Sequence, residues 1–143
     1  MSKKVLILSG SFRKHGNSDL LCDEFKRGAE EAGHSVEKIF INEKQIHYCR
    51  GCGVCNSTHK CVIKDDMAEI LDKMVKDFYF IVAAADNSHA NMEKTLEGFR
   101  GFTEDCLEDA REKGVIYGTG AWQIGDIKGQ PAMQEAYEAG RNI

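Results

Sequence analysis

Residues 5–18 have the sequence Val-Leu-Ile-Leu-Ser-Gly-Ser-Phe-Arg-Lys-His-Gly-Asn-Ser, and this stretch decides the fold. Its four leading apolar residues suit a β-strand that is buried on both faces, as in a parallel sheet. A helix is expected after the polar turn, because apolar or small residues then recur at helical spacing, namely Leu21, Phe25, Gly28 and Ala32. The stretch therefore predicts a strand, a turn and a helix in succession.

The same alternation of strand and helix continues along the chain. Further strands are expected at residues 36–41, 78–85 and 115–117, and further helices over 65–76, 92–110 and from 131 onward. Met92, Leu96 and Phe99 are expected on the inner face of the long helix over 92–110. Repeated alternation predicts a doubly wound α/β fold, with a parallel sheet between two helical layers and a ligand site beyond the carboxyl ends of the strands.

Length and composition indicate one soluble domain over residues 1–143. The chain is 42% hydrophobic and 29% charged, and its formal net charge is −4, so no global basic field would hold nucleic acid or an anionic membrane. No apolar stretch approaches the roughly 20 residues that span a bilayer, and the apolar run near the start is too short for a secretion signal. We therefore expect a cytoplasmic protein without nucleic-acid or membrane partners.

The turn at residues 9–18 is a candidate anion site. It contains neither a dinucleotide-binding glycine fingerprint nor a P-loop, but it has several hydroxyl and amide groups, Arg13 and Lys14, and it leads into a helix. The free N–H groups and positive dipole at a helix start favour a phosphate. Alternatively, Asn17 or Ser18 caps the helix and the two cations are solvated.

Four of the six cysteines lie close together, in a Cys-rich loop at residues 49–61. The pattern is Cys-x2-Cys-x2-Cys-x5-Cys, formed by Cys49, Cys52, Cys55 and Cys61. Three thiolates at steps of three residues suit one iron–sulfur cluster, with the fourth supplied a little later. Tetrahedral zinc and free or redox-active thiols are the alternatives. Cys22 and Cys106 fall within helices and are expected to be small core residues.

These motifs together resemble a known family. The pattern Ser9-x-Ser11-x-Arg13-x-x-Gly16-Asn17-Ser18 resembles the FMN phosphate loop of the flavodoxin-like NAD(P)H-dependent FMN reductases. The likeness continues through the cysteines, Asp65-Asp66-Met67 and Gly118-Thr119-Gly120. The compact cysteine motif is similar to that of the iron-sulfur flavoproteins in this family, which carry FMN and a [4Fe-4S] cluster.

The resemblance implies a set of site residues, cofactors and partners. FMN would be held by Ser9, Ser11, Phe12, Arg13, Asn17 and Ser18, and the cluster by Cys49, Cys52, Cys55 and Cys61. The electron donor would be NAD(P)H or another donor, and the acceptor a small molecule or a protein. The resemblance also implies a homodimer or homotetramer. No side chain need act as an acid or base, because the cofactors carry the chemistry.

The sequence departs from this family between Lys76 and Phe78. Family members there have a central strand, a loop that contacts the flavin ring and a further helix, whereas this chain has only Asp77. Either the chain is shortened, with the strand at 78–85 moving beside the first strand to leave four strands, or the sequence omits a segment. In the shortened chain, Asp86 and Asn87 become the next candidates to line the ring, with a capped helix start at Asn87 or Ser88 as the alternative.

Three functions are consistent with these observations. The first is an FMN-dependent oxidoreductase or electron carrier with an iron–sulfur cluster. The second is a non-enzymatic metal-binding or interaction domain of the same fold that has lost flavin binding. The third is an NAD(P)H-dependent quinone or FMN reductase without a cluster. The Gly-rich turn before Trp122 more often only makes a turn, and Trp122 itself is expected in packing or at an interface.

Overall fold

The computed structural model describes residues 1–74, 77–107 and 109–143, and the side chain of Cys106 also lies outside that description. The expected end of the helix over 65–76 lies partly outside the described residues. Within the described residues, no helix is long and apolar enough to cross a membrane.

The strands form two parallel pairs. β1 (Lys4–Ser9) pairs with β2 (Ser35–Phe40), and β3 (Asp77–Ala83) pairs with β4 (Arg111–Gly118). Among the described residues, no strand pairing joins β1 to β3, so there are two two-stranded sheets. The expectation that the strand after residue 77 moves beside the first strand is therefore wrong, although the strand itself is where the sequence predicts it.

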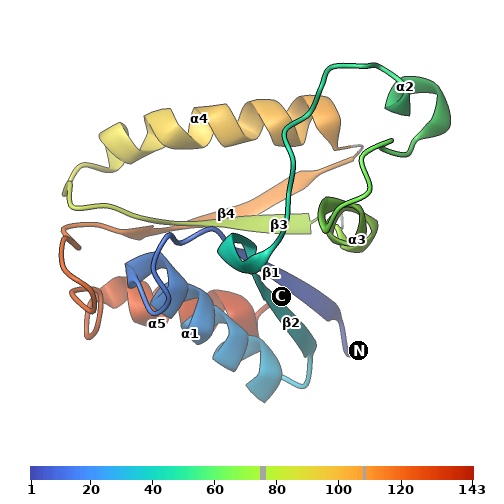
Figure 1. The fold of residues 1–143 in the computed structure, drawn as a ribbon. Helices are drawn as coiled ribbons and strands as arrows, with labels where there is room; N and C mark the ends of the chain where they lie inside the picture. Colours follow the sequence, from blue (N-terminus) through green and yellow to red (C-terminus); the bar gives the residue numbers. More distant parts are fainter. Residues whose placement is uncertain (75–76, 108) are drawn as a thin grey trace.

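Helices cover both sides of the strands, as expected for an α/β/α arrangement (Figure 1). α1 (Asn17–Glu31) and α5 (Pro131–Arg141) lie on one side, and α4 (His89–Cys106) lies along β3 and β4 on the other. A short 3-10 helix, η1 (Ile41–Glu43), follows β2. Two short helices, α2 (Cys55–Thr58) and α3 (Met67–Lys73), belong to the excursion between β2 and β3.

The α1–α5 contact organises the core. A Cβ atom at Gly28 would lie 2.0 Å from the Tyr137 carbonyl oxygen, and one at Gly140 would lie 2.0 Å from that of Phe25, so only glycine permits this approach. The Phe25 ring also meets the Tyr79 ring of β3 at 5.3 Å. The core cluster includes Ile7, Leu21, Phe25, Ile116, Ile127 and Ala136. It joins both sheets through α1.

A large cavity separates the two sheets. This inter-sheet channel has a volume of about 1090 Å³ and is lined by residues 3–11 through β1, by residues 77–84 through β3, and by residues of α1 and α4. Met92 and Leu96 of α4 are buried as predicted, but Phe99 is 52% exposed. Phe99 nevertheless lies on the predicted inner face, because its ring is 5.9 Å from the Phe80 ring of β3 and it lines the inter-sheet channel.

Candidate functional site

The turn between β1 and α1 is shaped around Gly16. A Cβ atom there would stand 2.7 Å from Ser11 Oγ and 3.0 Å from the Arg13 carbonyl oxygen, so this position favours glycine. Gly16 is also the N-cap of α1 and offers no side-chain cap, so neither Asn17 nor Ser18 caps the helix. Among the described residues, the N–H groups of Asn17 and Ser18 have no acceptor. Free N–H donors at a helix start can bind an anion.

The buried Asn17 side chain holds a second loop against the turn. Its Nδ2 donates to the carbonyl oxygens of Ala121 at 3.1 Å and Gln123 at 2.9 Å. Its Oδ1 accepts from the N–H groups of Gly125 at 3.0 Å and Ile127 at 3.4 Å. The family resemblance predicts Asn17 at the cofactor, whereas in the structure its side-chain amide is fully used in positioning the loop after β4.

Asp19, in the first turn of α1, brings a buried negative charge close to the turn. Its Oδ1 accepts from Ser9 Oγ at 2.7 Å, its Oδ2 accepts from the His15 N–H at 2.9 Å, and Lys38 Nζ lies 2.6 Å away. Burial raises the pKa of Asp19, but the hydrogen bonds to Lys38, Ser9 and the His15 N–H outweigh it and hold the pKa below its ordinary value. Lys38 therefore neutralises a carboxylate that would otherwise repel a phosphate.

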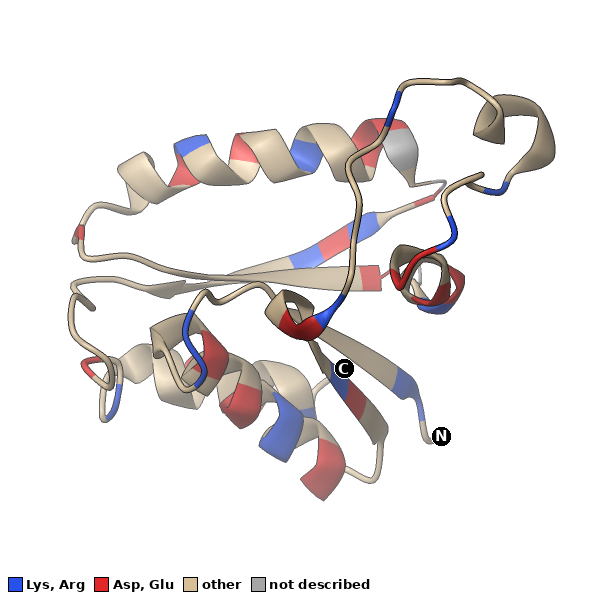
Figure 2. Cartoon of the chain, viewed as in Figure 1, with Lys and Arg blue, Asp and Glu red and all other residues tan. Residues whose placement is uncertain are grey.

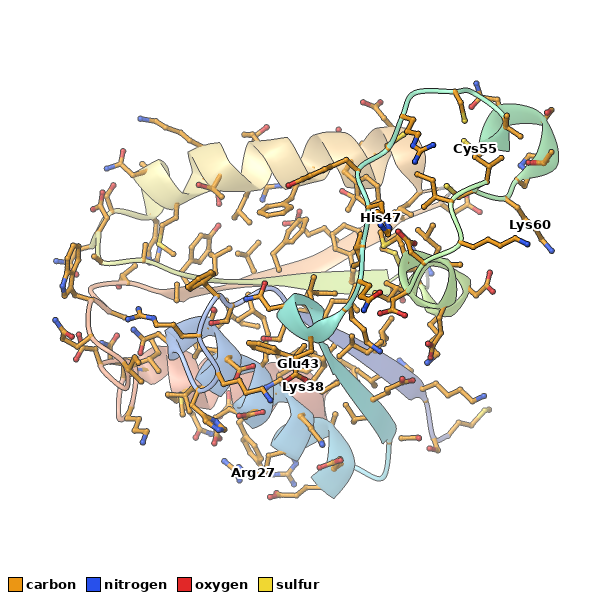
Figure 3. The ribbon with its side chains drawn as sticks, viewed as in Figure 1. Arg27, Lys38, Glu43, His47, Cys55 and Lys60 are labelled. Atoms are coloured by element: carbon orange, nitrogen blue, oxygen red, sulfur yellow. The ribbon has the colours of Figure 1, made fainter. Side chains whose placement is uncertain are left out.

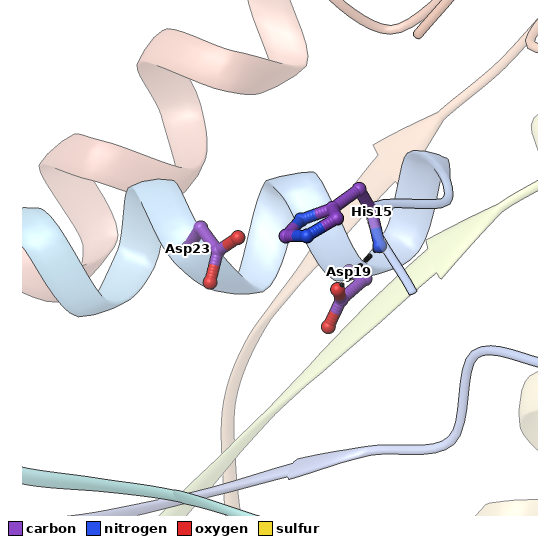
Figure 4. Close-up of side chains that lie close together, drawn as sticks. All are labelled: His15, Asp19 and Asp23. Atoms are coloured by element: carbon purple, nitrogen blue, oxygen red, sulfur yellow. Dashed lines mark hydrogen bonds between the residues drawn. The ribbon is translucent and has the colours of Figure 1, made fainter. Parts of the chain in front are cut away.

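His15, Asp19 and Asp23 form the one group of metal-ligand side chains, among the described residues, whose ligand atoms lie within 4.8 Å of one another (Figure 4). Lys38 also contacts Asp23 at 2.6 Å, so the cation already serves both carboxylates. Burial lowers the pKa of Lys38, and its hydrogen bonds to Asp19 and Asp23 raise it above the ordinary value. The group is an ion-pair cluster that stabilises the helix start.

A smaller cavity opens at the carboxyl ends of β3 and β4. Its volume is about 370 Å³, and it is lined by Arg13, by residues 83–85 and by residues 121–123. Trp122 lines it and is 71% exposed, so packing within the chain is the wrong expectation for this residue. Its place directly after the Gly-rich turn that follows β4 is the sequence signal for a position at the ligand end of the sheet. The cavity lies where the α/β fold predicts a ligand.

Asp86 and Asn87 follow β3 beside this cavity. Asp86 Oδ1 accepts from the Ser88 N–H at 2.8 Å, and Oδ2 accepts from Asn91 Nδ2 at 2.6 Å; these bonds, Asn91 first, hold the pKa of Asp86 below its ordinary value. Ser88 is the N-cap residue of α4 but makes no side-chain cap bond, so neither Asn87 nor Ser88 caps the helix with its side chain. Asn87 Oδ1 lies 2.5 Å from where a Gly120 Cβ would stand, so it packs on the turn after β4.

The remaining loop residues are spread over different surroundings. Phe12 is exposed, and Ser18 lines the inter-sheet channel together with Ser9 and Ser11. Lys14 forms an ion pair with Glu43 of η1. Of these two cations, Arg13 is the one that lines the smaller cavity. Of the predicted residues, the structure therefore brings Arg13 to the cavity at the strand ends, whereas Ser9, Ser11 and Ser18 line the inter-sheet channel.

The four loop cysteines are free and exposed. Gly51 and Gly53 have φ of 63° and 69°, so the backbone at both positions adopts the left-handed conformation of tight turns, which favours glycine. The Gly51 N–H donates to Cys49 Sγ at 3.4 Å, and the Ile63 N–H donates to Cys61 Sγ at 3.4 Å. Backbone donors of this kind stabilise thiolates and cluster sulfurs, so the donor set fits an iron–sulfur centre.

The surroundings of the cysteines are basic. Residues 44–64 contain no Asp or Glu, and their cations are Lys44, Arg50, Lys60 and Lys64. Figure 3 shows Cys55 and Lys60 on the outlying segment around α2, away from the sheets. Among the described residues, no three of the cysteine sulfurs lie within 4.8 Å of one another. Tetrahedral zinc with Zn–S bonds of about 2.3 Å would need its sulfurs closer than that.

Comparison with known proteins identifies the family. A model of the NADPH-dependent FMN reductases matches residues 3–87, which include the turn between β1 and α1, the four loop cysteines and β3. The chain belongs to this family. The match confirms the resemblance seen in the sequence.

Several relatives in the family are iron-sulfur flavoproteins. That of Archaeoglobus fulgidus is 34% identical over 96 residues, which cover 67% of this chain and 43% of the relative. That of Methanosarcina thermophila is 37% identical over 81 residues, covering 57% and 42%, and that of Methanocaldococcus jannaschii is 42% identical over 71, covering 50% and 37%. The matched part of the chain thus spans less than half the length of these relatives.

Solved structures support the fold. An NAD(P)H:quinone oxidoreductase from Methanothermobacter marburgensis matches with a TM-score of 0.57 over 99% of this chain and 96% of that chain, at 13% identity. A flavone reductase matches with a TM-score of 0.53 over 98% of this chain and 61% of that chain, at 18% identity. These likenesses confirm the flavodoxin-like α/β fold.

Proposed function

We propose that this chain is an FMN-dependent oxidoreductase that takes electrons from a reduced nicotinamide and passes them to a small-molecule or protein acceptor. The observation that carries the proposal is Arg13, which the Gly16 turn places on the cavity at the strand ends. A guanidinium beside free N–H groups at a helix start is suited to a phosphate monoester. When bound there, FMN would supply hydride and single-electron transfer.

The chain's own residues would bind and orient the cofactor. The N–H groups of Asn17 and Ser18, together with Arg13, would hold the phosphate, while Lys38 keeps the Asp19 carboxylate compensated. Trp122 offers an exposed aromatic surface to a ring in the same cavity. Asp86 and Asn87, which follow β3 next to this cavity, and Phe12 would lie at its rim, while Ser9 and Ser11 shape the turn from the side of the inter-sheet channel.

We further propose that Cys49, Cys52, Cys55 and Cys61 hold a [4Fe-4S] cluster, supported by the free thiols, the N–H donors to sulfur and the surrounding cations. In Figure 1 the segment around α2 and the turn before α1 lie on opposite sides of the molecule. We propose that electrons can pass between centres of different chains. This supports a homodimer or homotetramer as the working form.

The test is anaerobic purification followed by visible spectroscopy and by FMN, iron and zinc analysis. Stoichiometric FMN and about four irons per chain are expected for the two-cofactor protein. Arg13→Ala should weaken FMN binding about ten- to a hundredfold, because a charge-assisted bond contributes about 1.5–3 kcal/mol. Lys14→Ala is the matched control, since Lys14 is engaged by Glu43 and should leave FMN affinity nearly unchanged.

A second variant separates the two centres. Cys49→Ser should abolish iron binding and the brown colour while FMN remains bound. A protein that contains FMN but no iron, and whose colour Cys49→Ser does not change, would be a reductase without a cluster. A colourless protein that takes up neither cofactor on reconstitution would contradict the oxidoreductase and favour the metal-binding or interaction domain.

A further inference from the structure

Two neighbouring aspartates close the base of the Cys-rich loop. Asp65 Oδ2 accepts from the His47 N–H at 2.7 Å, and Asp66 Oδ2 accepts from the Gln45 N–H at 2.8 Å. The Asp66 N–H donates in return to the Gln45 carbonyl oxygen at 3.1 Å. Gln45, His47, Asp65 and Asp66 together form the carboxylate clamp. All four loop cysteines lie in the sequence between its two halves.

The Asp65 carboxylate is buried at the foot of an exposed loop. Its side chain is 4% exposed, whereas that of His47 is 66% exposed. Its Oδ1 accepts from the Met67 N–H at 3.1 Å, and His47 Nδ1 lies 3.3 Å from Oδ2. A carboxylate that is withdrawn from water needs such partners, because burial without them is costly. Asp65 therefore ties the start of the loop to the first residue of α3.

Both halves of the clamp are anchored to the rest of the fold. Before the first half, Asn42 Nδ2 of η1 donates to the Ser11 carbonyl oxygen at 2.9 Å. After the second half, Ile70 of α3 is buried, and Lys73 Nζ donates to Glu37 Oε1 of β2 at 2.7 Å. The base of the loop is therefore held in place, while the segment around α2 stands apart from the sheets (Figure 1).

The clamp limits how far apart the cysteines can lie. His47 and Asp65 are 18 positions apart, and a chain of that length can extend to about 60 Å. With the base closed, Cys49 is two residues from one half of the clamp and Cys61 is four residues from the other. Their Cα atoms therefore lie within about 7 Å and about 14 Å of the clamp. Closure of the base restricts the first and last thiols to one region before a metal binds.

The same two cysteines also have backbone donors at sulfur. Cys49 Sγ accepts from the Gly51 N–H and Cys61 Sγ from the Ile63 N–H, both at 3.4 Å. In the part of the chain that the structure describes, no three cysteine sulfurs lie within 4.8 Å of one another. The ends of the loop are thus fixed, and its middle is left to close on a metal.

Capping of α3 does not explain Asp66. This residue is the N-cap of α3, yet its side chain makes no cap hydrogen bond. Its Oδ2 accepts from the Gln45 N–H on the far side of the loop instead. Asp65, by contrast, also accepts from the first residue of the helix. Asp66 is therefore the residue whose replacement separates closure of the loop from the start of the helix.

We propose that Asp65 and Asp66 are positioning residues for the metal site of the Cys-rich loop. Their hydrogen bonds close the base of the loop, so that the four thiols are confined before the metal binds. Neither carboxylate is a ligand, because each acts through the backbone of residues 45–47. The inference rests on the proposed function, since it assigns these residues to the cluster that the cysteines would hold. Outer groups that orient ligands in this way usually change metal affinity about tenfold to a hundredfold.

The test is a Co²⁺ titration of the reduced, metal-free full chain under anaerobic conditions. Thiolates bind Co²⁺, and the complexes absorb visible light, so the titration reports on the cysteines without iron or FMN. Asp66→Ala should weaken Co²⁺ binding about tenfold or more. Asp66→Asn keeps an oxygen that can accept from the Gln45 N–H, and it should bind Co²⁺ nearly as tightly as the unmodified chain does.

Asp72→Ala is the matched control for the lost charge. Asp72 is exposed and lies on α3, the same helix that Asp66 precedes. Its removal takes away one carboxylate and should leave the Co²⁺ affinity within about twofold. Asp65→Ala, which also frees the Met67 N–H, should weaken Co²⁺ binding at least as much as Asp66→Ala does.

Hydrogen exchange tests the clamp without any metal. In the metal-free chain, the Gln45 amide should exchange about tenfold faster in Asp66→Ala than in the unmodified chain or in Asp72→Ala. After reconstitution with iron and sulfide, Asp66→Ala should also release iron to a chelator about tenfold faster than the unmodified chain. Its FMN content should be unchanged, because the clamp lies outside the cavity at the strand ends.

Three results would overturn the proposal. The first is an equal Co²⁺ affinity of Asp66→Ala and the unmodified chain. The second is an Asp66→Asn protein that binds Co²⁺ as weakly as Asp66→Ala, since charge rather than the acceptor would then matter. The third is an unchanged exchange rate of the Gln45 amide in Asp66→Ala. If the unmodified chain binds neither Co²⁺ nor iron, the cluster proposal fails and the positioning role fails with it. Metal binding that is equal in all variants contradicts the positioning role alone.

Discussion

Lys38 is the residue on which the electrostatics of the turn between β1 and α1 depend. Its side chain is 16% exposed and that of Asp19 is 5% exposed, so Lys38→Met would leave a buried carboxylate without its cation. Removal of one partner of such a pair costs about 3 kcal/mol of unfolding free energy. Loss of an exposed ion pair should cost little. Lys26→Met removes the exposed pair between Lys26 and Glu30 at 3.7 Å and should lower the free energy of unfolding by less than about 0.5 kcal/mol.

The pH dependence gives this prediction its sign. In the native protein the pKa of Asp19 lies below the ordinary 3.8, so its ionised form adds stability above that pH, and the stability is lost as the pH falls through the folded pKa. Without Lys38, burial dominates and raises the pKa of Asp19. The cost of Lys38→Met, measured by urea unfolding, should therefore be larger at pH 7 than at pH 4.5. Equal costs at the two pH values would contradict this account.

At the scale of elements, the α1–α5 contact makes a sharp prediction about helical glycines. Gly28→Ala would drive a methyl group into the Tyr137 carbonyl oxygen and should cost about 3 kcal/mol or more, because backbone cannot yield as a side chain would. Gly98→Ala in α4 meets nothing within 4 Å and should add about 0.5–1 kcal/mol of stability through helix propensity. Urea unfolding of both variants checks this, and a tolerated Gly28→Ala would refute the close contact.

The positions of the helices and strands could be predicted from the sequence, but the contacts between them could not. Hydrophobic period identified β1, β3, α1 and α5 because each pattern depends on neighbours along the chain. The periodicity also placed Gly28 on the buried face of α1, but not against α5, since that contact joins residues more than 100 positions apart. Likewise, the turn chemistry pointed to Arg13, whereas the use of Asn17 as a clamp on residues 121–127 required the folded chain.

On the scale of the whole molecule, the two sheets should unfold together because one helix packs on both. Phe25 of α1 meets Tyr79 of β3 and belongs to the same core cluster as Ile7 of β1. Phe25→Leu removes the ring contact and should cost about 1–2 kcal/mol while it weakens the coupling between the sheets. Phe12→Ala, at an exposed position, is the control and should change neither quantity.

Native-state hydrogen exchange measures this coupling directly. In the unmodified protein, amides of β1–β2 and of β3–β4 should open with the same free energy, since neither pair has a core of its own. In Phe25→Leu the opening free energies of the two strand pairs should differ. The β1–β2 pair should open at the lower free energy, because no helix covers it on the side where α4 covers β3 and β4. If both pairs lose protection equally in the variant, or already differ in the unmodified protein, α1 is not what joins them. The channel between the sheets would then be a boundary between two independent units rather than a gap within one fold.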